Sequence, residues 1–231
     1  MLCKRTFLCF AVGMLLSASA VWAGDAASFV DLGFSPDNTV YMFGQYGVQS
    51  GTLKPWADIF TVDIARNNFV NGGKISYIHD SSVVAGNDGA GALYRLITQN
   101  SAFANQYRIS YLNVGQPLYI AVNGAGNPGE SIEFRDFTSG NSYKANLVNY
   151  TEGTGQDIKS SFFINLENTN ASGKRAYTVG SPQIKRPLIE GYRIVKVMAS
   201  PDSNSLIFVI EMKKQNQDGF DIRYMIEAVK L

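Results

Sequence analysis

The sequence contains few of the residues that most often bind metals or act as nucleophiles. Among its 231 residues are two cysteines, Cys3 and Cys9, and one histidine, His79. Both cysteines lie near the N-terminus, in a stretch with the features of an export leader. Without that stretch the chain contains no disulfide, thiol nucleophile or cysteine metal ligand. An exported chain without cysteine is typical of a bacterial periplasm and less typical of a eukaryotic secretory route.

The sequence also lacks an excess of charge of either sign and a long apolar run. It has 20 Lys and Arg against 19 Asp and Glu, with a formal net charge of +1. With no dense basic run, it has no electrostatic basis for binding nucleic acid or an anionic membrane surface. After the leader, no stretch approaches the length of about 18 apolar residues that would predict a transmembrane helix.

Residues 1–23 have the three parts of a cleavable signal peptide. Lys4 and Arg5 supply positive charge, and residues 7–16 form an apolar stretch too short to span a bilayer comfortably. Val21-Trp22-Ala23 places small residues at the positions that a signal peptidase recognises, so cleavage is predicted after Ala23. An uncleaved anchor helix is the alternative. The expected location is the bacterial periplasm or the cell exterior.

The remaining chain, residues 24–231, is predicted to form a single β-rich extracytoplasmic domain with one short helix. Residues 29–34 and 40–46 are apolar strands separated by the turn Ser35-Pro36-Asp37-Asn38. Residues 59–65 alternate as a half-buried strand should. Apolar residues at helical spacing predict the helix over about 89–103. Short strands between Gly- and Asn-rich turns follow in a central β region, residues 107–187.

The C-terminal part repeats the plan of the first unit. Ser200-Pro201-Asp202 lies between apolar strands at residues 194–199 and 206–212, and a final strand covers residues 222–229. Strand, Ser-Pro-Asp turn, strand, loop and strand is a pattern typical of propeller blades, here in units 29–70 and 191–231. We favour two antiparallel β-meanders that clamp a central sandwich over a degenerate five-bladed propeller.

Both ends resemble a bacterial family of predicted secreted proteins, domain of unknown function 2259. The stretches that carry the resemblance are residues 29–37, 41–47, 55–65, 69–70 and 191–224, the last including Ser200-Pro201-Asp202. The resemblance implies export and a β-rich fold. It implies no catalytic residue, because the family has no established activity.

Three segments match known chemical motifs and fail on a specific requirement of each. Gly124 to Gly129 fits a dinucleotide fingerprint, but a strand pattern follows it where a helix should begin. Asn216 to Asp221 begins like a calcium loop and lacks the closing glutamate. His79 has no nucleophile elbow to work with and is predicted to be a polar loop residue after a strand. The sequence therefore predicts no cofactor, no metal site and no catalytic residue.

Aromatic and amide side chains near the loop Lys54-Pro55-Trp56 are the strongest candidates for ligand binding. Tyr and Trp offer a large contact area with a polar tip, which suits carbohydrate or protein ligands. The predicted site consists of Tyr41, Gln45, Tyr46 and Trp56.

These patterns favour a non-catalytic binding or interaction protein of the bacterial envelope, whose partner is an envelope protein or a carbohydrate. One alternative is a periplasmic hydrolase of glycan or peptide that uses paired carboxylates among Asp31, Asp37, Asp58 and Asp63. Another is a structural subunit of an envelope assembly, which would pair an edge strand with a partner.

Overall fold

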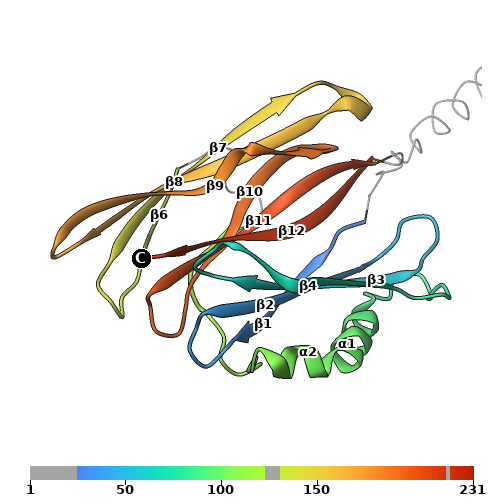
Figure 1. Ribbon diagram of the computed structural model, residues 1–231. Coiled ribbons are helices and arrows are strands. Elements are labelled where there is room, and N and C mark those ends of the chain that lie inside the picture. Colours follow the sequence, from blue (N-terminus) through green and yellow to red (C-terminus); the bar gives the residue numbers. More distant parts are fainter. Residues whose placement is uncertain (1–24, 123–130, 217–218) are drawn as a thin grey trace, which may run out of the picture.

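A computed structural model describes residues 25–122, 131–216 and 219–231 (Figure 1). Three antiparallel sheets, each of four strands, dominate this part of the chain. The predicted fold class, mainly antiparallel β with a short helical segment, is confirmed. The described residues form no closed barrel or propeller, so the propeller-like ring is wrong. The predicted signal peptide and Gly124 to Gly129 lie outside the described residues.

The first sheet, here called the N-terminal sheet, follows the order of the chain. Its strands are β1 (Ser28–Phe34), β2 (Val40–Val48), β3 (Pro55–Asp63) and β4 (Asn68–Ile78). The predicted first unit ends at residue 70, whereas β4 continues to Ile78. The sequence pattern misses most of β4 because this edge strand is largely exposed and only Ile75 and Tyr77 near its end alternate with exposed residues.

The second sheet, here called the central sheet, has the order β12-β11-β10-β5. Its strands are β5 (Gln116–Ile120), β10 (Ile189–Ala199), β11 (Ser205–Asn216) and β12 (Gly219–Lys230). β5 comes from the middle of the chain and pairs antiparallel with β10. The middle of the chain therefore contributes a strand to the sheet of the C-terminal unit.

The third sheet, here called the outer sheet, is formed entirely by the middle of the chain. Its strands are β6 (Ser131–Arg135), β7 (Ser142–Glu152), β8 (Lys159–Asn170) and β9 (Gly173–Pro187), with the 3-10 turn η1 (Gly155–Asp157) between β7 and β8. The apolar pattern does not predict β9, again because this strand lies at an edge and most of its side chains are exposed.

The helical segment predicted over residues 89–103 is present as two consecutive helices. They are α1 (Ala90–Gln99) and α2 (Ser101–Gln106), which cover the outer face of the N-terminal sheet (Figure 1). Leu93 and Leu96 of α1 are buried against Met42 and Ile59 of that sheet. No helix within the described ranges is long and apolar enough to cross a membrane.

The elements stack in four layers: helices, N-terminal sheet, central sheet and outer sheet (Figure 1). The central sheet is covered on both faces, which explains the continuous apolar run in β11. Leu206 and Phe208 face the outer sheet, whereas Ile207 and Val209 face the N-terminal sheet. A strand with only one buried face would alternate apolar with polar residues.

The two Ser-Pro-Asp sequences form the same turn. Ser35 N donates to Val40 O at 2.9 Å, and Val40 N donates to Ser35 Oγ at 3.0 Å. Ser200 and Ser205 form the same pair of bonds at 2.9 and 3.0 Å. In each turn the serine hydroxyl donates to the aspartate two residues later, at 2.6 and 2.5 Å. The internal repeat is therefore a repeat of turn geometry as well as of sequence.

A buried polar group joins all three sheets. Glu227 of β12 accepts a hydrogen bond from the Asn67 side chain, which follows β3, and lies 3.8 Å from Arg186 of β9. Asn67 Oδ1 also accepts from Ala228 N at 2.7 Å. Burial raises the pKa of the Glu227 carboxyl, and the bond from Asn67 and the charge of Arg186 partly offset that rise.

Candidate functional site

Three of the four predicted site residues are buried. Tyr41, Gln45 and Trp56 are 0%, 3% and 5% exposed, and Tyr46 is partly buried. Tyr41 packs in the core between the N-terminal and central sheets, whereas Tyr46 packs against the helix layer. The four residues therefore do not form one exposed aromatic surface, and their role in ligand binding stays a prediction.

Gln45 links two sheets. Its Nε2 donates to Asp58 Oδ2 on the neighbouring strand at 3.0 Å, and its Oε1 accepts from Tyr224 N of β12 at 2.8 Å. Both polar atoms of a buried amide are thus satisfied, as a buried polar side chain requires. These contacts give Gln45 a role in holding the N-terminal sheet against the central sheet.

Trp56 lies in a buried polar cluster that contains the first described residue of the chain. Its Nε1 donates to Asp25 Oδ2 at 2.5 Å, and Arg223 Nη2 of β12 donates to the same oxygen at 2.8 Å. The Arg223 guanidinium lies over the Trp56 ring, 4.2 Å from its centroid. Burial raises the pKa of Asp25, and Arg223 and Trp56 oppose that rise.

Two hollows are lined by Asp25 of this cluster, and a third shares lining residues with one of them. The largest, about 660 Å³, lies at the start of α1 and shares residues 86–88 with a second hollow of about 360 Å³. The second shares Asp25, Gln49 and Ser50 with a third hollow of about 370 Å³. These shared residues place the three hollows next to one another, in a row here called the groove, from α1 to the start of β12.

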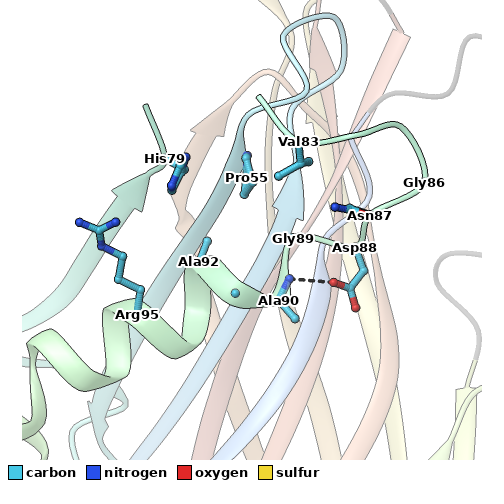
Figure 2. Close-up of a pocket in the computed structure, with 11 residues that line it drawn as sticks. Pro55, His79, Val83, Gly86, Asn87, Asp88, Gly89, Ala90, Ala92 and Arg95 are labelled. Atoms are coloured by element: carbon cyan, nitrogen blue, oxygen red, sulfur yellow. Dashed lines mark hydrogen bonds between the residues drawn. The ribbon is translucent and has the colours of Figure 1, made fainter. Parts of the chain in front are cut away.

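Side chains of both charges surround the α1 end of the groove (Figure 2). His79 and Arg95 lie on one side of it, and Asn87 and Asp88 lie on the other (Figure 2). Asp88 Oδ1 accepts from the backbone N–H of Ala90, the first residue of α1, at 2.9 Å, and Gly89 is the N-cap residue of that helix.

His79 and Arg95 are both held by neighbours at the end of β4. His79 lies directly after β4, as predicted, and its Nδ1 is 3.0 Å from both the backbone nitrogen and the carbonyl oxygen of Ser81. Tyr77 contacts the His79 ring edge-on, and the Arg95 guanidinium lies 5.2 Å from the Tyr77 ring centroid. This end of the groove can therefore donate hydrogen bonds to an acceptor or an anion.

Two glycines allow three chain segments to meet beneath the groove. A Cβ atom on Gly47 would lie 2.7 Å from Asp25 Oδ1 and 3.0 Å from the Trp56 ring. A Cβ atom on Gly89 would lie 2.5 Å from the Gly47 carbonyl oxygen, and the φ angle of Gly89 is +79°. Larger residues would force the N-terminal segment, β3 and the start of α1 apart.

The carboxylates considered for hydrolysis have separate partners. Asp37 belongs to the first Ser-Pro-Asp turn, Asp58 accepts from Gln45, and Asp63 accepts from a backbone N–H at 3.0 Å. Asp31 lies beside Tyr41, and burial raises its pKa despite the bond from the Gly33 backbone. Among residues 25–122, 131–216 and 219–231, no group of three His, Cys, Asp or Glu side chains could hold a metal.

Sequence reasoning finds the loop beside the groove but misses most of the groove itself. Pro55 and Trp56 are at or beneath it, as the choice of the loop Lys54-Pro55-Trp56 anticipates. Asp25, Arg95 and Arg223 have no motif that marks them, and they lie far apart in the sequence. The only available signal is Trp56, the single tryptophan outside the predicted leader.

A scan against family models matches residues 42–230 to the family described as predicted secreted protein (DUF2259). The match covers the first repeat unit from residue 42 onward, the middle of the chain and the second unit up to residue 230. Comparison with curated proteins gives no match. Comparison with solved structures gives none either.

Proposed function

Because the chain belongs to the DUF2259 family of predicted secreted proteins, we propose that it is an exported, non-catalytic binding protein of the bacterial envelope. The groove is its binding site. The observation that carries this proposal is that three neighbouring hollows share lining residues. The hollow at the start of α1 alone, at about 660 Å³, falls within the range typical of ligand sites.

The lining favours an extended and polar ligand. Gln49, Ser50, Thr52 and Asn87 offer amide and hydroxyl groups along its middle, next to the apolar side chains of Val48 and Leu53. Such a lining suits the hydroxyl groups of an envelope carbohydrate better than an apolar peptide face. Arg95 supplies a positive charge at the α1 end, so a negative group on the ligand would bind there.

Site-specific crosslinking in intact cells tests this proposal. A photoreactive residue at Asn87, which is exposed in the groove, should capture envelope carbohydrate, seen as an adduct sensitive to glycan-degrading enzymes. The control position is Thr178, which is exposed on β9 of the outer sheet. Equal capture at both positions, or capture at neither, would contradict the groove as the site. An adduct sensitive only to protease would identify a protein partner instead.

A matched pair of substitutions then tests the charge. Arg95→Gln should weaken capture at Asn87, because it removes the positive charge at the α1 end. Arg175→Gln, on exposed β9, should leave capture unchanged. Both variants should retain the stability of the parent protein within about 0.5 kcal/mol, as is usual for surface positions.

A further inference from the structure

The segment before β1 belongs to a different sheet from β1 itself. Ala26 pairs in parallel with Ile222 of β12, whereas β1 pairs with β2 in the N-terminal sheet. Ala27 N donates to Ile222 O at 3.0 Å, and Ile222 N donates to Asp25 O at 2.9 Å. Residues 25–27 therefore connect the beginning of the described chain to its last strand.

Asp25 is bound through its backbone as well as its side chain. Its backbone N–H donates to Asp221 Oδ1 at 3.1 Å, and its carbonyl oxygen accepts from Arg223 Nη1 at 3.0 Å. Its carboxylate receives the bonds from Trp56 and Arg223 described above, and its side chain is 4% exposed. A buried carboxylate is held in this way only while its partners remain in place, because an unpaired buried charge is strongly unfavourable.

The same residue forms part of the groove. Asp25 lines both of the smaller hollows, and Ala26 lines one of them. Asp25 Oδ1 is buried and has no hydrogen-bond partner among the described residues. Without residues 25–27, the two smaller hollows would lose a wall and Trp56 would lose its cover. The walls of the groove thus depend on a segment that follows the predicted cleavage point by two residues.

We propose that residues 25–27 are a latch that assembles the groove after export. Signal cleavage upstream of Asp25 leaves this segment on the mature chain, and its docking on β12 completes the groove wall. Removal of Asp25 by later trimming would open the groove. This inference rests on the proposed function only in taking the groove as the binding site.

Trp56 fluorescence reports latch docking directly. Once the leader that contains Trp22 is removed, Trp56 is the only tryptophan in the chain. The full chain is exported in a bacterial host and purified, and its processed N-terminus is checked by intact mass. In the parent protein, Trp56 should be protected from acrylamide quenching, since it is 5% exposed.

The test variant is Asp25→Ala, which removes the acceptor for Trp56 and Arg223. Quenching of Trp56 should increase severalfold and its emission should move to longer wavelength, while circular dichroism still reports folded sheets. Asp88→Asn is the control, because Asp88 lines the groove without a hydrogen bond to Trp56. Unchanged quenching in a folded Asp25→Ala protein would overturn the latch. Should that variant fail to fold, Asp25→Asn, which keeps one acceptor oxygen, should show the same change at smaller amplitude.

The two proposals fail in different experiments. Quenching requires no ligand, so an unchanged signal in Asp25→Ala together with normal capture at Asn87 would remove the latch and leave the binding role. If quenching of Trp56 increases in Asp25→Ala but the parent protein captures nothing at Asn87, the latch is supported and the binding role is contradicted. If both proposals hold, Asp25→Ala also loses capture at Asn87.

Discussion

The N-terminal repeat unit, β1 to β3, and the C-terminal unit, β10 to β12, have the same turn at one end and differ in structure at the other. Both contain the same Ser-Pro-Asp turn with the same pattern of hydrogen bonds. At the opposite end, a loop connects β2 to β3 beside the groove. At the same end of the C-terminal unit, β11 and β12 stay paired up to Asn216 and Gly219. The conserved turn geometry maintains the stack, and the divergent end carries the candidate site.

Equivalent positions in the two units also face equivalent directions. Tyr41 and Phe43 of β2 face the central sheet, which is the next layer, and Met42 faces the helices. In β11, Leu206 and Phe208 face the outer sheet, again the next layer, while Ile207 faces back to the N-terminal sheet. The two units therefore stack in the same orientation, and each needs a strand that is apolar on both faces.

The largest expected effect tests this equivalence in the cores. Phe43→Ala and Phe208→Ala should each lower the free energy of unfolding by about 3–5 kcal/mol, because both rings are at most 1% exposed. Urea unfolding followed by circular dichroism measures both. Phe69→Ala, where the ring is 49% exposed, is the control and should cost much less. If either core substitution lowers the free energy of unfolding by less than about 1 kcal/mol, the two core positions are not equivalent.

A smaller effect is expected at the divergent end. Gly47→Ala should lower the free energy of unfolding by about 1–3 kcal/mol, because its new Cβ would overlap Asp25 and the Trp56 ring. Gly91→Ala is the control: it lies in α1 with nothing within 4 Å of its Cβ, and should gain about 0.5–1 kcal/mol. Thermal unfolding compares the two variants. A neutral Gly47→Ala would mean that the three segments beneath the groove are not closely packed.

The shared turn predicts equal and modest losses in the two units. Ser35→Ala and Ser200→Ala each remove the hydroxyl that accepts from the strand that follows, so each should cost about 1 kcal/mol. The double variant should lose about twice that amount, because distant sites are additive. Markedly unequal single losses, measured by urea unfolding, would show that only one turn supports the stack.

The smallest expected effect is on how the free energy of unfolding changes at acid pH. Bonds from Ser35 and Thr39 lower the pKa of Asp37. For Asp202, burial raises the pKa, but bonds from Ser200 and Asn204 outweigh it and the net shift is downward. A lowered pKa in the folded state stabilises the protein above the ordinary aspartate pKa of about 3.9, and this stability is lost as pH falls through the folded value. Asp37→Asn and Asp202→Asn should therefore be less stable than the parent at neutral pH, and this difference should shrink below about pH 3. An undiminished difference at low pH would contradict the proposed source of stability.

The sequence predicts the buried strands better than the exposed ones. The apolar stretches in β2, β3, β10 and β11 mark these strands clearly, because their side chains fill cores on one or both faces. β4 and β9 leave no such pattern, since an edge strand is held by backbone bonds to one neighbour and its side chains mostly face solvent. The Ser-Pro-Asp repeat is read correctly as a turn and wrongly as evidence for a propeller.

Local patterns in the sequence determine the β-rich fold class, the two repeated turns and the helical segment. They also predict the export leader. These depend on residues close together in the chain, and their physical causes are short-range. Tertiary structure alone decides that the sheets stack in layers and that Gln45 joins two of them. It also decides that Asp25 meets Trp56 and Arg223, which lies 198 residues away from Asp25. The Asp25 carboxylate reaches Arg223 only when the segment before β1 pairs with β12. No local sequence pattern specifies this pairing.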